Sequence, residues 1–183
     1  MNRKRYLLAA GALLLAAGAA IPPAGAQTRR EQMWSSYDPT EVNGAQGGRR
    51  LPTLVAGNPF AVPQQEVVDA VARAMTGGQP MDQSVAVKAP MRVMMLFNAT
   101  TVTGYRICDR SKPVAVADLG PRGGSVDLVA TYCRGDSPQT QVVASLNGVS
   151  GPDDPRFADM IKQVTLSLFP FRNPDLNGDN FPD

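Results

Sequence analysis

The C-terminal stretch spaces its oxygen-bearing side chains in a pattern suited to a hard metal ion. Carboxylate and amide oxygens lie at Asp175, Asn177, Asp179 and Asp183, so alternate residues could face one centre. Ca²⁺ prefers about six to eight oxygen ligands arranged around a tight loop. These four residues therefore form a candidate calcium site.

The match to known calcium loops is incomplete. Asp175, Asn177 and Asp179 resemble the first three side-chain ligands of loops such as those of EF-hands or thrombospondin type 3 repeats. Asn180 stands where glycine makes the sharp turn, and no bidentate glutamate follows. We favour the alternative, a polar tail over 173–183 that holds no cofactor and is dispensable for folding.

Cys108 and Cys133 are the only cysteines of the chain. Both lie in segments that predict short strands, which could bring their Cα atoms within the required ~4.4–6.8 Å. A redox pair is disfavoured because CxxC spacing is missing. We predict a structural disulfide that stabilises the fold by about 3 kcal/mol through closure of the intervening loop.

Acid–base chemistry would depend on carboxylates, because the chain has no histidine. This absence excludes Ser-His-Asp triads, Cys-His dyads and HExxH zinc sites. Asp109, Asp118, Asp127 and Asp136 could supply the two carboxyl groups, about 5–10 Å apart, that a glycan-cleaving hydrolase needs. Asp154 or the residue before it is expected to cap a helix instead.

The N-terminal residues 1–26 predict a secretory signal peptide. A basic start at residues 3–5 precedes an apolar run over 6–20, and Ala24-Gly25-Ala26 offers a cleavage site before Gln27. The apolar run is shorter than the ~20 residues of a spanning helix, so we expect no stable membrane anchor after cleavage. The expected location is the periplasm or the exterior.

Export changes the net charge of the chain. The full sequence has 18 basic and 16 acidic residues, a net charge of +2. Removing Arg3, Lys4 and Arg5 with the signal peptide leaves 15 against 16, a net charge of −1. No basic stripe remains, so nucleic acid is not an expected partner.

Apolar spacing divides the rest of the chain into three parts. Residues 27–56 hold few periodic apolar residues and predict a flexible lead-in, residues 57–172 predict one α+β domain, and 173–183 predict the polar tail. Within the domain, the spacing predicts helices over 63–76 and 155–169. Alternating or apolar segments between them predict four or five strands.

Short connections between these strands favour an antiparallel meander. Two amphipathic helices on one face of such a sheet would make the simplest two-layer fold. The expected fold class is therefore α+β, an antiparallel sheet with both helices packed on one side.

Several short segments resemble small exported proteins of Gram-negative bacteria, periplasmic or lipoprotein-like, over about residues 56–174. These segments are Asn58-Pro59-Phe60, Leu96-Phe97-Asn98, Cys133-Arg134-Gly135-Asp136, Gly151-Pro152-Asp153-Asp154-Pro155 and Gln163-Val164-Thr165-Leu166-Ser167-Leu168-Phe169-Pro170. Some such proteins have a cysteine at the cleavage site, from which Ala26-Gln27 departs. The resemblance implies no activity and no functional residues.

Taken together, these patterns favour a non-catalytic accessory or binding module of the cell envelope. Its expected partner is an envelope protein or a small ligand. The alternatives are the carboxylate-only hydrolase acting on envelope glycan and a weak calcium-binding module in the tail.

Overall fold

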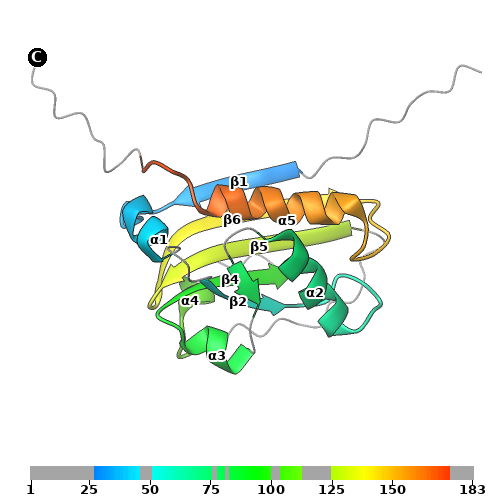
Figure 1. The fold of residues 1–183 in the computed structure, drawn as a ribbon, viewed down its shortest axis with the longest axis horizontal. Helices are drawn as coiled ribbons and strands as arrows, with labels where there is room; N and C mark the ends of the chain where they lie inside the picture. Colours follow the sequence, from blue (N-terminus) through cyan, green and yellow to red (C-terminus); the bar gives the residue numbers. More distant parts are fainter. Residues whose placement is uncertain are drawn as a thin grey trace, which may run out of the picture.

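The computed structural model describes residues 27–45, 51–75, 78–80, 83–99, 104–112 and 125–173. The elements are, in chain order, β1 (Gln27–Met33), α1 (Pro39–Ala45), β2 (Leu51–Ala56), α2 (Gln64–Ala74), β3 (Gly78–Pro80), α3 (Gln83–Lys88), β4 (Met91–Phe97), α4 (Gly104–Cys108), β5 (Ser125–Arg134), β6 (Ser137–Asn147) and α5 (Pro155–Leu168). The fold is α+β, as predicted (Figure 1).

The strands form one six-stranded mixed sheet in the order β1-β6-β5-β4-β2-β3. The antiparallel part, β4-β5-β6-β1, agrees with the predicted meander, but β2 runs parallel to both β3 and β4. The prediction of a purely antiparallel sheet is therefore wrong. The physical reason is that α2 and α3 connect successive strands and return the chain to the same end of the sheet, which makes those strands parallel.

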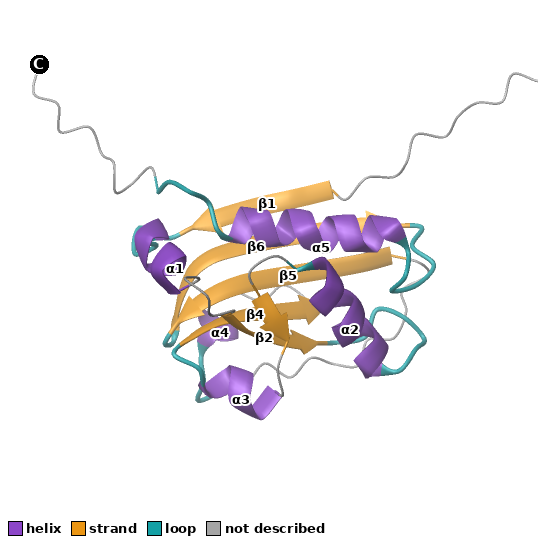
Figure 2. Ribbon diagram, in the orientation of Figure 1, coloured by secondary structure: helices purple, strands orange, loops and turns teal. Residues whose placement is uncertain are grey.

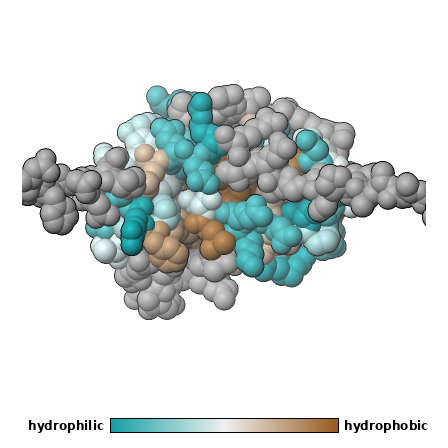
Figure 3. All heavy atoms as spheres, turned by 90° about the horizontal axis from the view of Figure 1, so that it is seen from above, coloured by the Kyte–Doolittle hydropathy of each residue, from teal (hydrophilic) through white to brown (hydrophobic). Residues whose placement is uncertain are grey.

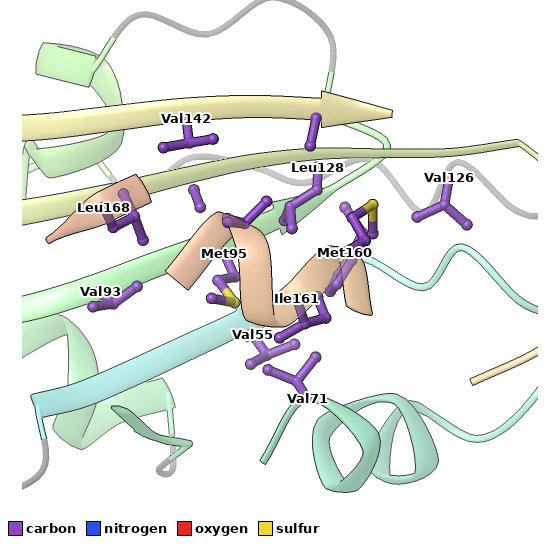
Figure 4. Close-up of a cluster of buried hydrophobic side chains, with 14 of the residues drawn as sticks. Val55, Val71, Val93, Met95, Val126, Leu128, Val142, Met160, Ile161 and Leu168 are labelled. Carbon is purple, nitrogen blue, oxygen red and sulfur yellow. The ribbon is translucent and has the colours of Figure 1, made fainter. Parts of the chain in front are cut away.

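Helices cover both faces of the sheet. On the side seen in Figures 1 and 2, α2 and α5 lie across the strands and enclose the larger core. Figure 4 shows Met160 and Ile161 of α5 among valine, leucine and methionine side chains of the strands and α2. On the opposite face, α3 and α4 contribute Ala86, Ile107 and Cys108 to a second, smaller core. The prediction that the helices pack on one face holds for α2 and α5 only.

The two long helices form where the apolar spacing predicts them. In α5, one stripe is fully buried, comprising Phe157, Met160, Ile161, Val164 and Leu168. Asp154 is the N-cap residue and its carboxylate accepts a hydrogen bond from the Arg156 backbone N–H at 3.0 Å. Pro155 occupies the first turn, where its missing N–H costs no hydrogen bond.

Cys108 and Cys133 form the predicted disulfide, with their Cα atoms 5.6 Å apart. The secondary structure around Cys108 differs from the expected strand, because residues 104–108 form the short helix α4. A segment of five residues is too short for its apolar spacing to distinguish a helix from a strand. The bond joins α4 to β5, and both cysteines are buried.

The guanidinium of Arg92 is buried beside this disulfide. It donates hydrogen bonds to the carbonyl oxygens of Ala89 at 3.2 Å, Gly135 at 2.8 Å and Cys108 at 2.6 Å. Arg92 also pairs directly with Cys133 in the β4–β5 register. The loop before β4, the β5–β6 turn and α4 are therefore held together by one side chain.

The described parts of 27–56, residues 27–45 and 51–56, form β1, α1 and β2, whereas the sequence predicts a flexible lead-in over this range. β1 pairs with β6, and β2 lies inside the sheet between β4 and β3. Tyr37 is buried, and its hydroxyl donates to the Pro170 carbonyl at 2.9 Å. Trp34 packs so closely on Gly104 that a Cβ atom there would lie 2.7 Å from the indole ring. We call residues 27–45 the N-terminal strap.

The C-terminal boundary of the domain also differs from the expected position. Asn173 is buried, and its side-chain amide donates to the Tyr37 carbonyl at 2.6 Å. The predicted tail therefore begins at least one residue later, and truncation has to leave Asn173 in place.

Substitution of either cysteine should lower the free energy of unfolding by a similar ~2–4 kcal/mol, because the disulfide restricts the unfolded chain. The double variant Cys108→Ser/Cys133→Ser should lose no more than either single variant. Urea unfolding of the four proteins tests this, and thiol labelling of the unreduced, unfolded protein should detect no free thiol. Two labelled thiols per chain would refute the bond.

Tyr37→Ala should lower the free energy of unfolding by about 3–5 kcal/mol, because it leaves a cavity in the larger core. Tyr37→Phe should lose only about 1 kcal/mol, the value of its hydrogen bond to Pro170. Tyr105→Phe is the matched control, since Tyr105 is 60% exposed and should have almost no effect. A loss below ~0.5 kcal/mol for Tyr37→Ala would show that the strap is not docked in solution.

Stability should fall in acid through Asp154, whose pKa is lowered to about 2, chiefly by the side-chain hydrogen bond from Arg156. A carboxylate with a lowered folded-state pKa stabilises the protein above its unfolded value near ~3.9, and this contribution disappears as the pH falls through the folded value. Asp154→Asn keeps a helix cap but removes the charge. It should cost about 1 kcal/mol at pH 6, and only a small part of this cost should remain at pH 2, where the folded-state carboxyl is about half protonated.

The control for this titration is Asp153→Asn. Asp153 pairs with Arg73 at 3.0 Å, but its side chain is 89% exposed, so its ion pair should contribute little. Urea unfolding between pH 2 and pH 7 separates the two residues. If the free energies of unfolding of Asp154→Asn and the parent protein differ by the same amount at every pH, that result contradicts this role of the Asp154 charge.

Candidate binding site

A pocket of about 330 Å³ lies between β1, β6 and the C-terminal end of α5. Its lining residues are Glu31, Gln32, Met33, Thr140, Gln141, Ser167 and Pro170. This volume is at the lower end of the range of small-molecule sites. The pocket is large enough for a small ligand or for one side chain of a partner.

The pocket exists because β1 extends the sheet beyond the helix that covers its neighbour. α5 packs on β6 and ends at Leu168, whereas β1 pairs with the outer edge of β6. The register places Met33 opposite Thr140, so these two residues lie side by side on the sheet. Pro170 follows Phe169, the C-cap residue of α5, and cannot continue the helix.

One charged group lies in the pocket. The Glu31 carboxylate is exposed and accepts a hydrogen bond from the Ser167 hydroxyl at 2.7 Å. The Thr140 hydroxyl donates a hydrogen bond to the Leu168 carbonyl at 2.6 Å. Among the described residues, Glu31 has no cationic partner within ion-pair distance.

Met33 and Pro170 provide the apolar surface of the pocket. Met33 packs against the larger core, and Pro170 is fixed by the hydrogen bond from Tyr37 to its carbonyl. Two exposed apolar residues are sequence neighbours of the lining, Leu166 at 56% and Phe171 at 86% exposure. Figure 3 views the molecule from the β1 side and shows brown, apolar residues among teal, hydrophilic ones.

Two buried tyrosines, Tyr37 of the strap and Tyr132 of β5, pack against each other in the larger core. Tyr37 and Tyr132 meet edge to face with ring centroids 6.4 Å apart. Burial raises the pKa of each to about 12, so both stay protonated at neutral pH and neither serves as a base. The Tyr132 hydroxyl has no hydrogen-bond partner among the described residues. The pair therefore contributes to packing.

Asp127 is too distant from Asp136 to form a catalytic pair with it. Asp127 and Asp136 lie toward opposite ends of β5, about 20 Å or more apart at ~3.4 Å per residue, which exceeds the separation that glycan hydrolysis requires. Hydrogen bonds from Arg110 lower the pKa of Asp136, and hydrogen bonds from Ser111 lower that of Asp109. A general acid needs the opposite shift. Asp118 lies outside the described residues.

The candidate calcium ligands lie outside the described residues as well. This holds for Asp175, Asn177, Asp179 and Asp183, so the structure gives no geometry for that site. Within the described part of the chain, no three His, Cys, Asp or Glu side chains come together as metal ligands. In the same part, no helix combines the length and the apolar character needed to cross a membrane.

The sequence alone did not reveal this pocket. Three of its lining residues lie in β1, whose sequence Gln-Thr-Arg-Arg-Glu-Gln-Met contains one apolar residue and no alternation. The strand forms because β6 supplies hydrogen bonds to its backbone, which a sequence pattern does not show. Thr140 and Gln141 lie in a predicted strand and Ser167 in a predicted helix, but their spacing gives no sign that β1 lies beside them.

Comparison of the chain with protein-family models, with curated proteins and with solved structures gave no match.

Proposed function

We propose that the protein is a non-catalytic binding module of the periplasm, with the pocket beside Glu31 as its ligand site. The observation that carries the proposal is the lining of this pocket, in which one carboxylate and several hydrogen-bonding groups adjoin apolar walls. Such a mixture of apolar surface with a few polar groups is typical of ligand sites.

The chemistry available in the pocket favours binding over catalysis. Glu31 is the only carboxylate among the described lining residues, so the two-carboxylate mechanisms of glycoside hydrolysis find no second group among them. Ser167 is hydrogen-bonded to that carboxylate, and the same lining residues include no histidine or lysine to act as its base. Export is supported by the signal-peptide pattern before Gln27 and by the buried disulfide, which requires an oxidising compartment.

The test is ligand retention by protein purified from the periplasm. Native mass spectrometry of the mature chain should detect a small bound molecule, or a periplasmic extract should raise the melting temperature. Ser167→Tyr fills the pocket and should abolish both effects. Gln163→Tyr places the same side chain on the exposed side of α5 and should abolish neither.

Two results would contradict the proposal. One is a parent protein that retains no ligand and shows no thermal shift with the extract. The other is hydrolysis of envelope glycan that disappears on substitution of a single carboxylate, such as Asp136→Asn.

A further inference from the structure

The charge balance around the pocket indicates what kind of ligand it takes. Four described carboxylates already have arginine partners, in the pairs Arg73–Asp153, Arg110–Asp136, Arg134–Glu41 and Arg156–Asp154. Glu31 differs from them, since it accepts a hydrogen bond from the neutral Ser167 hydroxyl. The pocket therefore presents a carboxylate that no described cation neutralises.

The surroundings of Glu31 restrict the ligand further. Met33 and Pro170 provide apolar walls next to the carboxylate, and such walls suit methylene groups. The remaining lining side chains are the amides of Gln32 and Gln141 and the Thr140 hydroxyl. Because no lysine or arginine is among the described lining residues, an anionic ligand would meet Glu31 without a compensating positive charge from that part of the chain.

We propose that this pocket binds an ammonium or guanidinium group carried on an aliphatic stem. The cation would pair with Glu31, while the stem lies between Met33 and Pro170. This inference rests on the proposed binding function and specifies its ligand.

The same chemistry has two sources, a free amine or a lysine or arginine side chain of an extended polypeptide. β1 is the end strand of the sheet, so the main chain of a peptide could pair with its outer edge. Alternate side chains of such a peptide would lie on the face that carries the pocket. A free amine would use the pocket alone.

The experiment is an NMR titration of the ¹⁵N-labelled mature chain at low salt with two matched probes. Nα-acetyl-lysine methylamide carries the ammonium group, and Nα-acetyl-norleucine methylamide has the same stem without it. The lysine probe should shift the amide signals of Glu31, Met33, Thr140 and Ser167. It should bind about fivefold more tightly than the norleucine probe, as expected for one exposed charge pair.

Glu31→Gln is the critical variant, because its amide oxygen can still accept the hydrogen bond from Ser167. It should weaken binding of the lysine probe about fivefold and leave the norleucine probe unchanged. Glu66→Gln, at an exposed position of α2, is the control and should change neither affinity. Added salt should remove most of the difference between the probes.

Equal affinity for the two probes, or equal affinity of the parent protein and Glu31→Gln, would overturn the inference. If Ser167→Tyr still abolished retention of the periplasmic ligand, the proposed binding function would survive that result. A tripeptide, acetyl-Ala-Lys-Ala-amide, distinguishes the sources. Tighter binding with additional shifts along β1 supports a polypeptide, and affinity equal to that of the single residue supports a free amine.

Discussion

The second core of this protein is organised around a buried positive charge. Arg92 has no carboxylate within ion-pair distance among the described residues; its two Nη atoms donate to three backbone carbonyls, and its Nε has no hydrogen-bond partner among those residues. Burial lowers its pKa, as does the nearby charge of Arg110, yet an arginine stays protonated in proteins. Its charge is therefore balanced by oriented dipoles, and these dipoles have to stay in place for the core to remain stable.

This requirement links α4, the loop before β4 and the β5–β6 turn. Cys108 provides a carbonyl to Arg92 and a covalent bond to Cys133, which is the partner of Arg92 across the β4–β5 ladder. Gly135 accepts from Arg92 and donates its own N–H to the Pro90 carbonyl at 2.7 Å. α4 is thereby fixed to the sheet, and Gly104 on that helix provides the surface against which Trp34 packs. Through these contacts, the position of the N-terminal strap depends on the buried charge.

The sequence predicted those elements whose own residues carry the signal. The apolar stripes gave α2 and α5 within two residues at each end, and alternation gave β5 and β6. The pairing of the cysteines followed from their number. In contrast, β1, the parallel pairing of β2 and the helical form of α4 depend on partners distant in the chain, so local spacing gave no sign of them. The candidate site was missed for the same reason, because Glu31 and Met33 become neighbours of Ser167 only after β1 pairs with β6.

The place of β1 has a consequence for the order in which the fold can be completed. Met33 pairs with Thr140, which follows it by 107 residues, so β1 is synthesised long before β6, the strand with which it pairs. Contacts between such distant segments close a long loop and form slowly. Until they form, the edge of β6 presents unpaired backbone groups that another chain could occupy. β1 therefore protects the edge of β6 once it has paired with it. Until then, β6 can pair with the wrong strand.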